Sequence, residues 1–273
     1  MSIAISTTNY KAIIFDLGGV CVGSPMQGIS KYEKEHGLPP NYINVAIVKR
    51  GENGAFQRFE RGELLIPKFY EIFGNELSDP INKEYYQQYL SSRNGGNNSS
   101  PSSSKIPSIT VDGKLLFRYM ISETLIIDPT VFYALKCLRA SNKYKIAALT
   151  NNFPAPVHEV DRKEVAAWGR GGEGGVPTPI EELYEMFHVI VESSVVGLRK
   201  PDPKIFLLAC EQLKVSPKEA IFLDDIGINL KSAKNLGMKT IKVELGKSAE
   251  AIRQLEAIVG LLLFEQKKNV SLL

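Results

Sequence analysis

Residues 11–20 read KAIIFDLGGV, and this stretch decides the fold because it joins an apolar run to an acidic residue and two glycines. No polar residue interrupts the run 12–15, which is typical of a strand buried on both faces. Asp16 then stands at the tip of the strand, where the glycines allow the backbone to turn tightly. A carboxylate there either serves chemistry at a sheet edge or caps the next turn, and this stretch alone favours neither.

Further apolar runs of the same kind lie downstream, at 146–149, 189–191, 221–223 and 239–243. Helical patterns lie between them. The clearest is 203–213, where apolar residues recur on one helical face, and a second covers 229–236. Strands that alternate with helices predict an α/β fold with a doubly wound parallel sheet.

About 130 residues separate the first two runs, far more than the dozen or so that a crossover needs. An inserted domain is therefore expected, and its patterns are helical, at 31–36, 42–50, 66–73, 81–90 and 113–122. We predict an α/β core of residues 1–22 and 128–273 and a helical cap of residues 23–127. Two stretches of biased composition predict loops, a disordered Ser/Asn-rich one at 91–105 and a Gly-rich one at 168–179 in the core.

Composition excludes several classes of protein. The 273 residues carry 33 basic and 30 acidic side chains, a net charge of +3 that is too weak to indicate nucleic-acid binding. Three widely spaced cysteines form no CxxC pair, so neither a disulfide framework nor a zinc site is expected. No apolar run is long enough to span a membrane. These features predict a cytoplasmic protein without a membrane span.

Polar side chains follow four of the predicted strands directly. They are Asp16, Thr150, Glu192 and Asp224. Ligands of open α/β sheets bind beyond the carboxyl ends of the strands, so these groups are expected to meet at one edge. Four such groups from distant segments indicate a binding or catalytic site.

Two segments supply groups suited to a phosphoryl oxygen. KIAALTNN ends in Thr150 and Asn151, whose hydroxyl and amide can donate hydrogen bonds, although the same residues also suit an ordinary turn. In VGLRKPDPKIF, Pro201 holds Lys200 extended just before a helix. A fixed cation there can neutralise developing charge and keep Asp16 ionised; a surface lysine is the alternative.

The segment AIFLDDIGINL, residues 220–230, carries the most specific signal. Asp224 and Asp225 follow a buried strand and repel each other unless a cation or hydrogen bonds compensate them. Oxygen ligands without clustered His or Cys favour Mg²⁺ over zinc. Asn229 is spaced to hydrogen-bond these carboxylates from outside the ligand set.

The segments around these residues, in this order, resemble the four motifs of the haloacid-dehalogenase superfamily. GAFQRFERGEL, GLRKPDPKIF and FLDDIGINLKSAKNLGMKTIKV are further similar to the N-terminal phosphatase domain of soluble epoxide hydrolases and the related domain of acyl-CoA dehydrogenase family member ten. The resemblance covers roughly residues 10 to 265 apart from the two loops. It implies a Rossmann-like core, a helical cap and Mg²⁺-dependent hydrolysis of a small phosphorylated substrate.

Matched by position, the resemblance implies a role for each site residue. Asp16 is the expected nucleophile and belongs to the expected metal site together with Asp224 and Asp225, of which Asp225 is the direct ligand and Asp224 lies beside it. The carbonyl of Gly18 is a further expected ligand. Catalytic roles are expected for Thr150 and Asn151 as phosphate binders and for Lys200 as the charge clamp.

One position departs from the superfamily pattern. The phosphatase motif places a second Asp two residues after the nucleophile, and this sequence has Gly18 there. That Asp protonates the leaving group, a contribution typically worth about 10²–10⁴ in rate. Three hypotheses remain: a Mg²⁺-dependent phosphatase acting through an aspartyl-phosphate on Asp16, a non-catalytic or very weak protein of the same fold, and a metal-free dehalogenase-like hydrolase.

Overall fold

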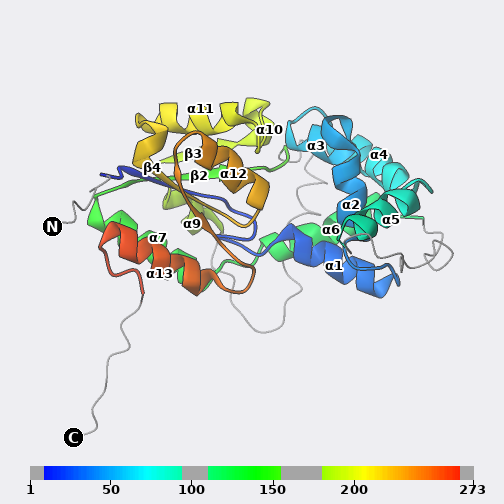
Figure 1. The fold of residues 1–273 in the computed structure, drawn as a ribbon, viewed down its shortest axis with the longest axis horizontal. Coiled ribbons are helices and arrows are strands. Elements are labelled where there is room, and N and C mark those ends of the chain that lie inside the picture. Colours follow the sequence, from blue (N-terminus) through cyan, green and yellow to red (C-terminus); the bar gives the residue numbers. More distant parts are fainter. Residues whose placement is uncertain (1–8, 94–109, 155–179, 265–273) are drawn as a thin grey trace, which may run out of the picture.

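The computed structural model describes residues 9–93, 110–154 and 180–264. Within these ranges a single five-stranded sheet has the order β3-β2-β1-β4-β5 (Figure 1). The strands are β1 (Ala12–Phe15), β2 (Lys145–Thr150), β3 (Val189–Glu192), β4 (Ala220–Asp224) and β5 (Lys239–Lys242). All neighbours are parallel. The order reverses beside β1, which makes the carboxyl ends of β1 and β4 the topological switch point where ligands bind.

Helices cover both faces of the sheet, which confirms the predicted doubly wound α/β fold. One face packs on α11 (Pro203–Leu213) and α12 (Gly227–Asn235), the other on α7 (Pro129–Ser141), α9 (Ile180–Glu185) and α13 (Ser248–Val259). Ile13 and Phe15 point into one layer, while Ala12 and Ile14 point into the other. Because both faces are buried, β1 shows no polar alternation.

A group of helices between β1 and α7 forms a layer beside the sheet. It comprises α1 (Pro25–Glu35), α2 (Tyr42–Lys49), the 3-10 helix η1 (Gly51–Asn53), α3 (Ala55–Glu60), α4 (Ile66–Ser78), α5 (Asn82–Arg93) and α6 (Gly113–Thr124). We call these residues, 25–93 and 113–124, the helical unit. It has its own apolar core, in which the rings of Phe59 and Phe69 stack with centroids 4.0 Å apart and Phe117 meets both edge-on.

The chain enters and leaves the helical unit at one place. The amide of Gly23 donates to the carbonyl of Ile126 at 2.8 Å, and Val22 bridges to Ile127. The two connections therefore lie side by side. Figure 1 shows them on the side of α1 and α6, whereas α3 lies next to α10 (Ser193–Val196) of the sheet layer on the other side.

Several elements differ from the sequence expectation. Helix α1 starts at Pro25 rather than near residue 31, because Pro25 suits a first helical turn and the Ser24 hydroxyl accepts from the amide of Met26. Helix α5 continues to Arg93, so the loop expected at 91–105 has three helical residues, and its remainder and the stretch 168–179 lie outside the described residues. Among the helices that the structure describes, none has the length and apolar character needed to cross a bilayer.

Candidate active site

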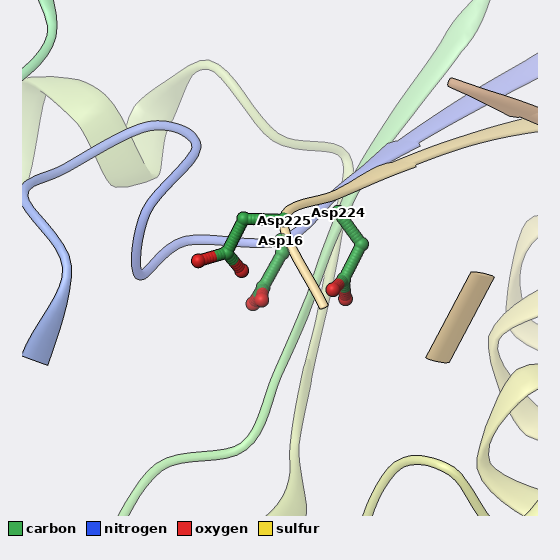
Figure 2. A group of neighbouring side chains, drawn as sticks. All are labelled: Asp16, Asp224 and Asp225. Atoms are coloured by element: carbon green, nitrogen blue, oxygen red, sulfur yellow. The ribbon is translucent and has the colours of Figure 1, made fainter. Parts of the chain in front are cut away.

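Three carboxylates meet at the switch point of the sheet. Asp16 follows β1, Asp224 ends β4 and Asp225 comes next, and one oxygen of each lies within 4.8 Å of the others. Figure 2 shows the three groups side by side beyond the strand ends. The pairing of β1 with β4 creates this meeting, since the amide of Asp16 donates to the carbonyl of Leu223 at 2.9 Å.

The turn after Asp16 has glycine where the neighbouring carboxylate needs room. Gly19 has φ +77°, and a Cβ added there would lie 2.3 Å from Oδ2 of Asp225. Both the backbone conformation and the approach of Asp225 therefore require glycine. A Cβ on Gly18 would lie 3.2 Å from Cδ of Pro25, so the place of the missing second Asp borders the start of α1.

Lys200 lies between two of the carboxylates. Its side chain is 1% exposed, and Nζ is 2.8 Å from Oδ1 of Asp16 and 2.8 Å from Oδ2 of Asp224. The Asn151 side chain fixes the backbone here, accepting from the Lys200 amide at 2.8 Å and donating to its carbonyl at 3.0 Å. Lys200 is therefore held in place through both its main chain and its ammonium group.

Burial and charge shift the pKa values of the cluster. Burial raises the pKa of Asp16 well above its ordinary value, Lys200 opposes this, and the two other carboxylates add to it. Burial disfavours the ammonium form of Lys200, but Asp16 and Asp224 outweigh it and raise the lysine pKa. Burial and then Asp224 raise the pKa of Asp225 to about 6. Three carboxyl groups thus face one ammonium, an arrangement that favours the uptake of a proton or of a further cation.

The two adjacent aspartates differ in their partners. Asp224 is fully buried and accepts from Lys200, from the Ile226 amide at 2.7 Å and from Nδ2 of Asn229 at 3.2 Å to each oxygen. Oδ1 of Asp225 is buried and has no hydrogen-bond partner among the described residues. An unpartnered oxygen within an all-oxygen donor set fits a hard divalent cation such as Mg²⁺. Asp16, Asp224 and Asp225 are the residues whose oxygens lie close enough together to hold it.

The residues expected at the strand ends lie at the same sheet edge, but not all face the cluster. Thr150 is buried at the end of β2, and its hydroxyl donates a long hydrogen bond of 3.5 Å to the Asn151 carbonyl. Glu192 instead accepts from Nδ2 of Asn152 at 2.5 Å. Oδ1 of Asn152 also accepts a hydrogen bond from the Ser194 hydroxyl at 2.9 Å. Glu192 therefore orders the loop after β2.

Sequence reasoning missed two contacts with the helical unit. Arg199 binds Glu60 of α3, with Nε and Nη2 at 2.8 and 2.6 Å from Oε2. Phe153 stacks on Phe59, with ring planes 4° apart. The available signals were an Arg beside Lys200 and a Phe after the Asn pair, but nothing in the sequence indicates their partners.

Comparisons with known proteins agree with this architecture. The family model "haloacid dehalogenase-like hydrolase" matches residues 10–237. Mouse (Mus musculus) acyl-CoA dehydrogenase family member 10 is 33% identical over 253 residues, covering 92% of this chain and 19% of the relative. Pig (Sus scrofa) bifunctional epoxide hydrolase 2 is 28% identical over 256 residues, covering 93% and 40%.

A shorter match points to a named phosphatase. Glyceraldehyde 3-phosphate phosphatase of Methanopyrus kandleri is 36% identical over 66 residues, or 24% of this chain and 28% of the relative. The chain thus spans about a fifth and two fifths of the two longer relatives. The matches confirm the resemblance inferred from the motifs.

Proposed function

The chain belongs to the haloacid dehalogenase-like hydrolase family, and from this premise we propose that it is a Mg²⁺-dependent phosphatase acting on a phosphate monoester. One observation carries the proposal: Asp16 lies at the switch point beside the ammonium of Lys200 and an acidic pair, in which a buried oxygen of Asp225 has no hydrogen-bond partner among the described residues. The named phosphatase relative supports the same reaction class.

In this proposal Asp16 is the nucleophile. Its carboxylate oxygen forms a bond to phosphorus while the bond from phosphorus to the leaving oxygen breaks, and water later hydrolyses the acyl phosphate. Lys200, 2.8 Å away, favours the ionised form of Asp16 against the effect of burial and faces the charge of the transferring group. The Thr150 hydroxyl, whose bond to the Asn151 carbonyl is long at 3.5 Å, would turn to donate to a phosphoryl oxygen.

The remaining site residues hold this arrangement. Asn151 fixes Lys200, while Asn229 and Lys200 orient Asp224. The side-chain amide of Asn151 already bonds the main chain of Lys200, so Asn151 would bind phosphate through its main chain. Mg²⁺ held by Asp16, Asp225 and the Gly18 carbonyl would neutralise excess negative charge and polarise the phosphoryl group.

Gly18 favours a second candidate, a protein of this fold with little or no turnover. No side chain at this position can protonate the leaving group, so we expect a slow enzyme that prefers leaving groups needing no proton. The third hypothesis, a metal-free dehalogenase-like hydrolase, explains Gly18 but leaves the acidic pair and the unpartnered oxygen of Asp225 uncompensated.

We further propose that the helical unit acts as a cap over the site, with residues 23–127 as the inserted segment and the rest as the core. Phe153 follows Asn151 closely in the sequence and Arg199 directly precedes Lys200, and both contact α3 of this unit. A substrate at the carboxylate cluster would therefore also meet the helical unit, which is where specificity for a small phosphorylated molecule would lie.

Hydrolysis of an aryl phosphate with and without Mg²⁺ tests the proposal. Wild type should turn over only with Mg²⁺, and Asp16→Asn should abolish turnover. If wild type shows no turnover and Gly18→Asp gains it, the protein is one that has lost activity. Gly18→Asp should also be combined with Pro25→Ala, because the Pro25 ring borders the new side chain. Halide release from a haloacid without metal would contradict the phosphatase function.

A further inference from the structure

Two neighbouring residues of α3 contact the two core segments that carry the proposed phosphate-binding groups. Phe59 stacks on Phe153, three residues after Thr150, with ring centroids 5.5 Å apart. Glu60 binds Arg199, the residue before Lys200. A single turn of helix therefore reaches both segments.

The contact with Arg199 is buried and directed. Oε2 of Glu60 accepts from Nε and Nη2 of Arg199 at 2.8 and 2.6 Å, and the two side chains are 8% and 17% exposed. Charge-assisted bonds of this kind fix an orientation better than single neutral ones. Glu52 also lies beside Arg199, but at 3.5 Å from Nη1 and with a side chain 70% exposed.

The position of this ion pair in the fold allows it to hold the helical unit against the sheet layer. The two covalent connections of the helical unit lie together near Gly23 and Ile126. They do not hold the opposite side of the unit against the sheet layer. There, α3 meets α10, and Gly62 packs so closely on the Ser194 carbonyl that an added Cβ would lie 2.4 Å from it. The Glu60–Arg199 pair is a largely buried ion pair that fastens this side.

We propose that Glu60 is a positioning residue: through Arg199 it holds the 198–202 segment so that Lys200 points at Asp16 and Asp224, and the helical unit thereby completes the site. Asn151 fixes Lys200 from the sheet side, while Glu60 fixes the preceding residue from the helical unit. Lys200 is then correctly placed only while α3 is docked. The kinetic readout of this inference rests on the proposed phosphatase function.

The test compares Glu60→Gln with Glu52→Gln, which removes a charge beside the same arginine but from an exposed position. With an aryl phosphate and Mg²⁺, Glu60→Gln should lower kcat by about 10- to 100-fold, the cost of a misplaced catalytic group, with little change in KM. Glu52→Gln should change kcat by less than about threefold, as for an exposed ion pair. Arg199→Lys, which keeps the charge and loses the fork, should fall between them.

Hydrogen exchange supplies a readout that does not depend on turnover. Below the melting temperature, the amides of Leu198, Arg199, Lys200 and Asp202 should exchange at least about tenfold faster in Glu60→Gln than in Glu52→Gln, while α6 exchanges as in wild type. Equal exchange in both variants, or a lower melting temperature of Glu60→Gln with unchanged kcat, overturns the inference. If wild type lacks turnover, the phosphatase proposal fails and exchange alone decides this one.

Discussion

Replacement of Lys200 by Met removes the cation that the carboxylate cluster needs in the absence of metal. Oxygens of Asp16, Asp224 and Asp225 lie within 4.8 Å of one another. At that distance, with an effective dielectric of about 20, two unit charges of like sign repel by about 3.5 kcal/mol. Removing one partner of a buried ion pair typically costs about 3–5 kcal/mol. We therefore expect the free energy of unfolding to fall by about 3–5 kcal/mol.

Urea denaturation at pH 7 in EDTA measures this loss, with exposed Lys204→Met as the matched control. The control should change stability by less than about 0.5 kcal/mol. In Lys200→Met, saturating Mg²⁺ should restore more stability than it adds to wild type, because the metal then supplies the missing charge. The loss should also shrink toward pH 5, where the cluster can take up a proton. A loss below about 1 kcal/mol in EDTA would refute the view that Lys200 neutralises this cluster.

Three further predictions concern the supporting residues. The folded-state pKa of Asp225 is raised to about 6 from 3.8, so the metal-free protein should gain stability as pH falls from 7 to 4. Mg²⁺ affinity, measured by titration calorimetry, should fall below about pH 6. Asp225→Asn should weaken both trends, and Asp16, whose pKa is also raised, should account for what remains. Gly19→Ala should weaken Mg²⁺ binding at least about tenfold, because the new Cβ displaces Asp225. The control is Gly51→Ala, which also has positive φ but faces open space. It should lower stability by about 1–2 kcal/mol and leave the Mg²⁺ affinity unchanged. Glu33→Ala should lower the free energy of unfolding by about 1–3 kcal/mol, because the amides of Asn41 and Ile43 lose their buried acceptor; an unchanged urea midpoint would contradict this.

The sheet could be predicted from the sequence because its strands are buried on both faces and therefore appear as uninterrupted apolar runs. Each predicted run falls within one residue of the strand that the structure contains, as for 146–149 within Lys145–Thr150. Helix α3 was missed because six residues are too few to show a helical period. The start of α1 was missed because Gly28 interrupts the apolar pattern, although it is the glycine that lets α1 approach the Tyr119 carbonyl of α6.

The candidate site divides in the same way. Asp16, Asp224 and Lys200 follow strands or precede a helix, so local pattern and topology together place them at one edge. The second role of Asn151 was not predictable, because the amide's partner is the main chain of Lys200, 49 positions away. Glu60 and Arg199 are 139 positions apart, and only the packing of α3 on the sheet layer brings them together.

Trapping the covalent intermediate tests the central claim, that Asp16 accepts the phosphoryl group, most directly. The protein is mixed with an aryl phosphate and Mg²⁺, quenched in acid and digested, and the peptide containing Asp16 is analysed by mass spectrometry. Because Gly18 supplies no acid–base group to speed hydrolysis, the acyl phosphate should accumulate. In wild type the peptide should therefore gain one phosphoryl group, and only when Mg²⁺ is present. In Asp16→Asn it should gain none. Release of inorganic phosphate without an adduct, or an adduct on another residue, would contradict the assignment.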